Sequence, residues 1–227
     1  MYFDMTYIVL VLPAMLLAMW ASANVNSTYK KYSKVISSSG YTANDVVRRI
    51  LDANGLSHVR IEHVKGDLTD HYDPKANVIR LSDTVDGSRS AAAIGVAAHE
   101  AGHAVQHAVG YFPIKVRMAI VPICNLGSNL AMPLILLGLV ASIYPLCYLG
   151  IIAFATATFF QLVTLPVEFN ASGRALAILK NAHMSDEDLK ASRKVLTAAA
   201  LTYVAALAVS LANLLRLILV VNGRRRD

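Results

Sequence analysis

Residues 118–167 read MAIVPICNLGSNLAMPLILLGLVASIYPLCYLGIIAFATATFFQLVTLPV and contain no Asp, Glu, Lys or Arg. About 20 apolar residues in a helix cross the hydrocarbon core of a membrane, so this stretch is long enough for two crossings. Tyr144-Pro145 is the favoured turn, which gives spans near residues 119–143 and 146–165. Pro122 and Pro133 should kink the first span, a distortion that transmembrane helices tolerate. The stretch therefore predicts a transmembrane hairpin.

The composition of the whole chain agrees with a membrane protein. Of 227 residues, 56% are hydrophobic and 16% are charged, whereas soluble domains have about 25% charged residues. The net charge of +6 would suggest nucleic acid in a soluble protein, but in a membrane protein it marks cytoplasmic loops, and we expect no nucleic-acid partner. Cys124 and Cys147 lie inside apolar runs, which excludes a disulfide framework and a cysteine metal site.

Two further apolar runs predict one more span each. Residues 7–23 follow no basic residue and precede lysines at positions 30, 31 and 34. These flanks favour an anchor with its N-terminus outside over a cleaved signal peptide, although Ala21-Ser22-Ala23 resembles a cleavage site. Residues 196–221 are interrupted only by Arg216, which can snorkel to the interface; a helix lying on the membrane surface is the alternative.

The hydrophilic segments show helix caps and strand alternation. We expect a helix from the capping box Thr42-x-x-Asp45 to Gly55. Two strands should follow at 59–63 and 78–82, with a turn at 73–77 between them. A second helix should run from Asp86 or Ser88 to Gly110, and a third should begin at the cap Ser185-x-x-Asp188. The fold class is therefore α+β within a mainly helical membrane protein.

The helix that ends at Gly110 carries His99-Glu100-Ala101-Gly102-His103, an HExxH motif. Residues at i and i+4 share one helical face, so His99 and His103 can bind one Zn²⁺. Glu100 lies beside that face, where it can take a proton from a water that the metal activates. A chance match is the alternative for so short a motif, but the capped helical context favours a catalytic zinc site.

A zinc peptidase needs a third protein ligand. His107 shares the face of His103, but it lies about 12 Å along the helix from His99, too far for all three to bind one ion. Glu168 lies at the edge of a span, where a carboxylate costs free energy unless it is paired with another group or binds a metal. Two spans between His103 and Glu168 return the chain to its starting side, so Glu168 can reach the ion. Pairing with Arg174 is its alternative role.

These residues carry a resemblance to a known family. The matching elements are Asp70-His71-Tyr72-Asp73-Pro74, Val78-Ile79-Arg80-Leu81-Ser82, the helix from Gly95 to Ala108 (GVAAHEAGHAVQHA) and Leu165-Pro166-Val167-Glu168-Phe169. The chain resembles the YugP-like neutral zinc metallopeptidases of bacterial membranes over nearly its whole length. The resemblance implies a zinc protease, and it too indicates a ligand at Glu168. The HExxH spacing predicts one zinc per chain.

A more distant similarity connects the chain to gluzincins of the HtpX kind, whose third ligand begins an ExxxD pattern. Here Ser172 stands four residues after Glu168, so the carboxylate of that pattern is absent or supplied by Asp70 or Asp73. His71, Tyr72 and His107 are candidates for oxyanion or substrate contacts. For the remaining histidines, His58, His63 and His183, we expect structural or solvent roles.

We therefore expect a membrane-bound zinc metalloendopeptidase with a zincin-like catalytic part. It divides into a transmembrane anchor (1–24), the catalytic α+β part (25–117), the hairpin (118–167), a cytoplasmic segment with the third ligand (168–195), and a span with a basic tail (196–227). The strand at 78–82 is predicted to be an edge strand that binds an extended protein or peptide substrate. The expected partners of the protein are that substrate and the lipid bilayer. We expect the protein in the inner membrane, with its active site facing the cytoplasm.

Three alternative functions remain at this point. A zinc-stabilised scaffold or chaperone-like protein would keep the ligands, but a structural zinc site prefers four protein ligands and needs no carboxylate like Glu100. An intramembrane protease would need a longer apolar run than the one between Arg89 and Glu100. A transporter would carry ionisable residues within its spans, and only Arg216 qualifies.

Overall fold

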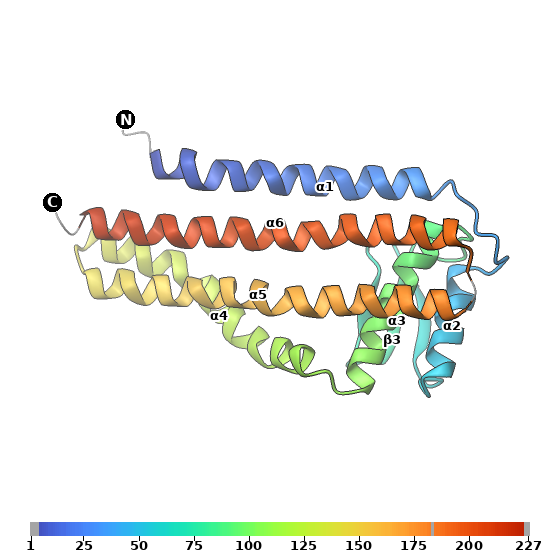
Figure 1. Ribbon diagram of the computed structural model, residues 1–227. Coiled ribbons are helices and arrows are strands. Elements are labelled where there is room, and N and C mark those ends of the chain that lie inside the picture. The colour runs from blue at the N-terminus through green and yellow to red at the C-terminus, as the bar shows by residue number, and fades with distance from the viewer. Residues whose placement is uncertain (1–4, 183, 225–227) are drawn as a thin grey trace. The chain divides into compact units, whose positions relative to one another are not determined.

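The computed structural model describes residues 5–182 and 184–224. Its elements are η1 (Tyr7–Val11, a π-helix), α1 (Leu12–Tyr32), α2 (Ala43–Ala53), β1 (Arg60–Val64), β2 (His71–Asp73), β3 (Val78–Ser82), α3 (Ala91–Ala108), α4 (Phe112–Val140), α5 (Tyr144–Asn181) and α6 (Asp186–Arg224) (Figure 1). The chain divides into two units. The helical unit is Met1–Ser22, Lys115–Pro166 and Leu201–Asp227, and the α+β unit is Ala23–Ile114 and Val167–Ala200.

In the described part of the chain, four helices are long and apolar enough to cross a membrane. They are Tyr7–Tyr32, Phe112–Val140, Tyr144–Asn181 and Asp186–Arg224, so the predicted hairpin and the two outer runs all appear as helices. Large side chains on α4 stay open to the surroundings: Ile123, Leu126 and Leu137 are 60%, 62% and 61% exposed. Such apolar exposure fits contact with lipid rather than water. The protein is accordingly a membrane protein.

Close backbone packing joins α4 to α5 within the helical unit. A Cβ atom on Gly150 would lie 2.8 Å from the Ala131 carbonyl oxygen, so only glycine permits this approach. The two helices are separated at residues 141–143, where Ser142 adopts a positive φ of 57°. The predicted turn at Tyr144-Pro145 is therefore wrong by a few residues, because these two residues begin α5. Small residues at helix contacts are the usual basis of close packing inside a membrane.

The α+β unit contains a three-stranded sheet in the order β1-β3-β2. β1 is parallel to β3 and β2 is antiparallel to it. The strand at 78–82 was predicted as an edge strand, and this is wrong: β3 has a neighbour on each side. The short strand β2 was not predicted, and it supplies one of the two edges. Because Ile79 and Leu81 are fully buried in the core of this unit, β3 has the apolar character of a central strand.

Local capping sets where the helices of this unit begin. Thr42 and Asp45 form the predicted capping box on α2, and Ser185 accepts a hydrogen bond from the Asp188 N–H at the start of α6. α3 begins at Ala91, later than predicted, because Ser90 is the residue whose side chain caps it. Its small alanines then pack closely into the core, which fixes the helix that carries His99 and His103.

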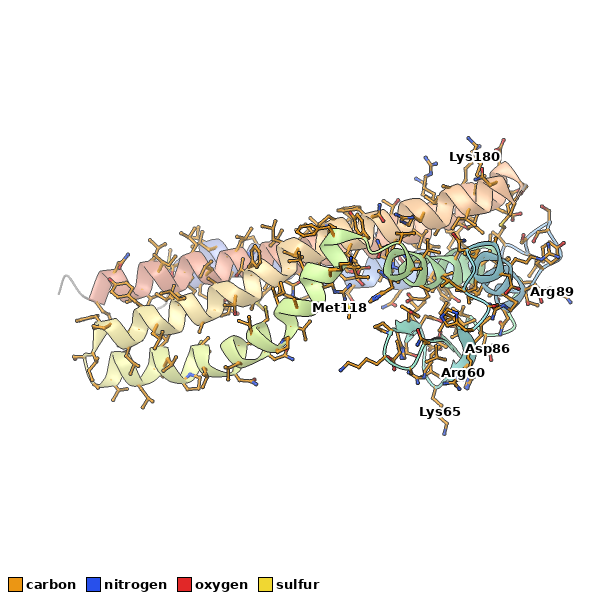
Figure 2. The ribbon with its side chains drawn as sticks, turned by 90° about the horizontal axis from the view of Figure 1, so that it is seen from below. Arg60, Lys65, Asp86, Arg89, Met118 and Lys180 are labelled. Carbon is orange, nitrogen blue, oxygen red and sulfur yellow. The ribbon has the colours of Figure 1, made fainter. Side chains whose placement is uncertain are left out.

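Charged side chains are concentrated in the α+β unit. Among the described residues, those of the helical unit are Lys115, Arg117, Arg216 and Arg224. Arg225 and Arg226 of the basic tail lie outside the described residues, as does His183, for which we expected a structural or solvent role. Figure 2 labels charged residues of the α+β unit, among them Lys65 and Lys180, whose side chains extend outward. This distribution of charge is expected if the helical unit lies in lipid and the α+β unit in water.

Candidate metal centre

α3 places two imidazoles against each other. His99 and His103 lie one helical turn apart, with ring centroids 4.7 Å apart and an interplanar angle of 85°. Their Nε2 atoms are separated by 3.1 Å. Both side chains are largely covered, with 13% and 12% of their surface exposed. Two ring nitrogens therefore converge on one point beside the helix.

Glu168 of α5 reaches the same point. Its Oε2 atom lies 3.3 Å from His99 Nε2 and 3.5 Å from His103 Nε2, and the residue is 3% exposed. Arg174, the alternative partner considered for Glu168, instead donates from Nε to Asn170 Oδ1 at 2.8 Å. The two histidines and Glu168 form the group of described residues that could hold a metal ion.

The three ligand atoms have the spacing that a zinc ion requires. Ligands at 2.0–2.1 Å in a tetrahedron around zinc are about 3.3–3.4 Å from one another, and the observed separations are 3.1, 3.3 and 3.5 Å. Two imidazoles with one carboxylate are a donor set of catalytic zinc sites, which keep the fourth position open. The residues present therefore fit zinc.

The other ring nitrogen of each histidine has a partner of its own. Ser172 Oγ lies 3.1 Å from His99 Nδ1, and Gln106 Oε1 lies 3.0 Å from His103 Nδ1. A proton on Nδ1 that is shared with such an oxygen leaves the Nε2 lone pair for a metal. Neither oxygen was predicted to act here. Ser172 was noted only because an aspartate was missing at this point of the sequence, and its hydroxyl contacts His99.

The two aspartates proposed as substitutes are engaged elsewhere. Asp70 accepts from the Ser82 N–H and hydroxyl, both at 2.8 Å. Asp73 accepts from the backbone of Lys75 and Ala76. In the described part of the chain, neither carboxylate bonds a ligand histidine, so Ser172 replaces both as the candidate partner of His99.

Glu100 lies beside the ligands in a different environment. It is 8% exposed, and across the described residues no hydrogen bond reaches its carboxylate. Burial raises the pKa of Glu100 above its usual value, although the neighbouring His99 and His103 partly oppose this. A buried carboxylate with a raised pKa and free oxygens is suited to accept and return a proton.

A glycine lets α3 and α5 approach closely at the centre. A Cβ atom on Gly102 would lie 2.8 Å from the Ala171 carbonyl oxygen. Any larger residue at this position would push α5 away, and Glu168 with it. The glycine inside the HExxH motif is therefore part of what brings the third ligand to the histidines.

Tyr72 and His71 are neighbours in β2 but have different surroundings. Tyr72 contacts the His107 ring edge-on, with centroids 5.4 Å apart, and it packs against the core on the α3 side of the sheet. Burial raises the pKa of the Tyr72 hydroxyl, so it is protonated and a hydrogen-bond donor at neutral pH. His107 thus lies beside the sheet edge formed by β2.

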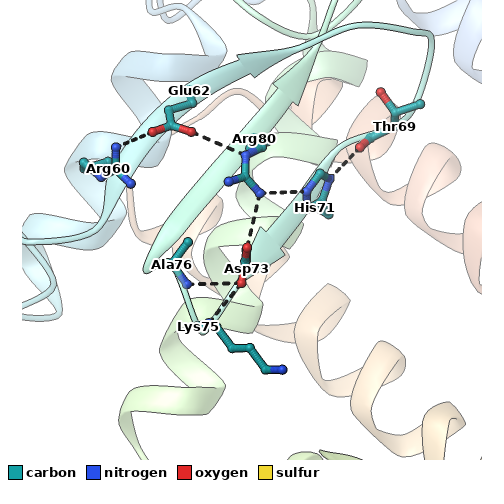
Figure 3. A network of polar contacts seen from close by, with 8 residues as sticks. All are labelled: Arg60, Glu62, Thr69, His71, Asp73, Lys75, Ala76 and Arg80. Atoms are coloured by element: carbon teal, nitrogen blue, oxygen red, sulfur yellow. Dashed lines mark hydrogen bonds and ion pairs between the residues drawn. The ribbon is translucent and has the colours of Figure 1, made fainter. Parts of the chain in front are cut away.

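His71 belongs to a polar network on the other face of the sheet (Figure 3). Side chains alternate along a strand, and the His71 Nδ1 lies 2.9 Å from the Thr69 carbonyl oxygen. Arg80 contacts His71, Asp73 and Glu62, so it joins all three strands. We therefore retain Tyr72, and not His71, as the candidate for an oxyanion contact.

Comparison with known proteins agrees with this centre. Residues 7–222 match the family described as "Putative neutral zinc metallopeptidase". The chain belongs to this family. It is 49% identical over 222 residues to the "Putative membrane protease YugP" of Bacillus subtilis (strain 168), which covers 97% of this chain and 99% of that protein. No solved structure matched the chain. The predicted family resemblance is confirmed, and both findings support a peptidase.

Proposed function

We propose that the protein is a membrane-bound zinc metalloendopeptidase of the gluzincin type. His99, His103 and Glu168 hold one zinc ion per chain, and Glu100 is the general base. The observation that carries the proposal is the convergence of three ligand atoms at 3.1–3.5 Å beside a buried carboxylate that bonds no described residue. The family membership and the protease relative support the same conclusion.

The chain's own residues supply the proton transfers. Zinc, when bound, acts as a Lewis acid that makes a water nucleophilic near neutral pH and polarises the substrate carbonyl. Glu100 takes the proton of the attacking water as the new C–O bond forms. It then returns a proton to the amine nitrogen as the C–N bond breaks. The Tyr72 hydroxyl is the candidate donor to the oxygen that becomes negative.

An extended peptide would bind along β2. This strand is the sheet edge in contact with α3, through Tyr72 and His107, whereas β3 has both neighbours in place. Strand addition uses unpaired main-chain groups at such an edge. The Arg80 network holds β2 to the rest of the sheet (Figure 3), which stabilises the edge on which a substrate would lie.

The distribution of basic residues favours a cytoplasmic active site at the inner membrane. The basic residues on the side of the centre are Lys30, Lys31, Lys34, Lys115, Arg117, Arg174, Lys180, Arg193 and Lys194. By the order of spans in the sequence, the opposite side would have chiefly the arginines at the end of the last span, Arg224, Arg225 and Arg226. Loops rich in Lys and Arg stay in the cytoplasm. The four long helices would hold the centre next to the bilayer, and its substrates would be membrane-associated proteins.

The rival function is a zinc-stabilised scaffold or chaperone-like protein. Glu100 argues against it, because a structural zinc site prefers four protein ligands and needs no buried carboxylate beside them. The three-ligand set leaves a position for the reacting groups.

Quantitative proteomics of membranes tests the proposal. Cells that produce the wild type are compared with cells that produce Glu100→Gln at equal abundance, with Glu62→Gln as a control on the outer sheet face. We expect particular membrane proteins to accumulate only with Glu100→Gln. Identical profiles, together with no hydrolysis of any peptide in a random library by the purified zinc-loaded wild type, would refute a peptidase.

A further inference from the structure

Gln106 is a fully buried polar residue that links the two helices of the metal centre. It lies three residues after His103 on α3 and has 0% of its surface exposed. Its Nε2 atom donates to the Val167 carbonyl oxygen at 2.8 Å and to Asn170 Oδ1 at 3.0 Å. Its Oε1 atom lies 3.0 Å from His103 Nδ1. All polar atoms of this amide therefore have partners.

The partners on α5 fix the orientation of the Gln106 amide. The Val167 carbonyl can only accept, and Asn170 Oδ1 is already an acceptor for Arg174 Nε at 2.8 Å, so the Gln106 NH₂ group must face α5. The Gln106 oxygen must then face His103. Because that oxygen can only accept, His103 carries a proton on Nδ1, which leaves Nε2 as its atom for binding a metal.

The same amide fastens the turn of α5 that carries Glu168. Val167 and Asn170 flank Glu168, and Pro166 immediately precedes this turn. Proline has no N–H, so Pro166 cannot donate the usual hydrogen bond to the carbonyl four residues earlier in α5. The two bonds from Gln106 hold the turn that follows this proline against α3.

We infer that Gln106 is a positioning residue of the metal centre: it holds His103 in the tautomer that binds metal, and it holds the Glu168 turn against α3. This inference rests on the proposed function, because it takes zinc as the bound ion. Gln106 itself offers no atom to the metal, because its oxygen and nitrogen are both used.

The test measures zinc affinity, by competition with a chromophoric chelator, in the full-length protein purified in detergent. Gln106→Leu removes all three bonds at similar volume, and we expect zinc to bind about 10–100-fold more weakly, as for other partners of metal ligands. Asn170→Ala removes one bond and should cost about fivefold. If Gln106→Leu does not fold, Asn170→Ala carries the test.

The matched control is Ser192→Ala. Ser192 is also fully buried, and its hydroxyl donates to the Ala91 carbonyl of α3 at 2.9 Å, yet it contacts no ligand. We expect this variant to keep wild-type zinc affinity. An equal loss in Ser192→Ala would show that any buried bond to α3 matters, and would overturn a positioning role.

A spectroscopic readout separates positioning from general stability. With ¹⁵N-labelled histidine in the zinc-loaded protein, His103 of the wild type should bind zinc through Nε2 alone, with its proton on Nδ1, and Gln106→Leu should show a second population. Zinc binding within twofold of wild type in both Gln106→Leu and Asn170→Ala, or a single unchanged His103 signal in Gln106→Leu, would overturn the inference. A wild type that binds no zinc would refute the proposed function first, and this inference with it.

Discussion

Two groups of histidines and charged side chains in the α+β unit differ in their exposure and in their hydrogen-bond partners. On the sheet and its turns, His63 Nε2 lies 2.6 Å from Asp83 Oδ1, with side chains 46% and 53% exposed, and His71 has an acceptor at Nδ1 and Arg80 at Nε2. At the metal centre, two imidazole nitrogens and a carboxylate oxygen face one another under cover. Each histidine of the first group has its own hydrogen-bond partner, whereas three possible ligand atoms converge on one point in the second group.

This difference shows which histidines have a chemical role. Exposed ion pairs contribute about 0–1 kcal/mol to stability, so the sheet network can be altered at little cost. Buried electron-pair donors repel one another unless a cation or a shared proton lies between them. We therefore expect substitutions at the centre to change metal binding and activity, and substitutions on the sheet to change stability slightly.

The largest effect should come from Glu100→Gln. The amide cannot accept the water's proton, so kcat/KM for a model peptide should fall about 10²–10⁴-fold, while zinc content stays at the wild-type level. Glu62→Gln, on the sheet network, should keep full activity. Peptide cleavage by Glu100→Gln at the wild-type rate would show that another group is the base.

Removal of Glu168 should have the next largest effect. Glu168→Ala should weaken zinc binding more than about 100-fold, because loss of a ligand exceeds the 10–100-fold effect of an outer partner, and the loss should be comparable with that in His103→Ala. His107→Ala and His63→Ala should keep their zinc. The measurement is metal content by mass spectrometry after dialysis against a weak chelator. Zinc retained by Glu168→Ala would remove it from the ligand set.

A smaller effect should follow from Gly102→Ala, which tests the close approach of the two helices. The added methyl group would lie 2.8 Å from the Ala171 carbonyl oxygen, and such overpacking costs about 1–3 kcal/mol, with weaker zinc binding as α5 moves. Gly173→Ala is the matched control, since nothing lies within 4 Å of its Cβ position. Thermal unfolding measures both, and equal stability of the two variants would contradict the packing described.

The smallest effect should come from Arg80→Ala. The guanidinium joins three strands, but its side chain and its carboxylate partners are all partly exposed, so stability should fall by about 1 kcal/mol or less. Zinc affinity should be unchanged. A loss of zinc from this variant would mean that the two groups are not independent, and denaturant titration alongside metal analysis can detect it.

Much of the architecture could be predicted from sequence because it depends on local signals. Charge-free runs determine the long helices, and the capping residues Thr42 and Ser185 begin helices where expected. The spacing of His99 and His103 places both on one face of a helix. Glu168 could be found by combining the cost of a buried carboxylate with the number of spans before it.

The parts that escaped prediction depend on contacts between distant segments. β2 has three residues and no alternation long enough to recognise, so β3 was taken for the edge. Gln106 looks like an ordinary helix residue until its amide meets Val167 and Asn170 of α5. Ser172 likewise gives no signal in the sequence that its hydroxyl lies at His99 Nδ1.

The most direct test is an experimental structure of the zinc-loaded protein with anomalous diffraction measured at the zinc absorption edge. We predict one peak per chain, about 2.0–2.2 Å from His99 Nε2, His103 Nε2 and a Glu168 carboxylate oxygen, with no peak near His63 and Asp83. A zinc ion held by other residues, or a Glu168 carboxylate turned away from both histidines, would contradict the account.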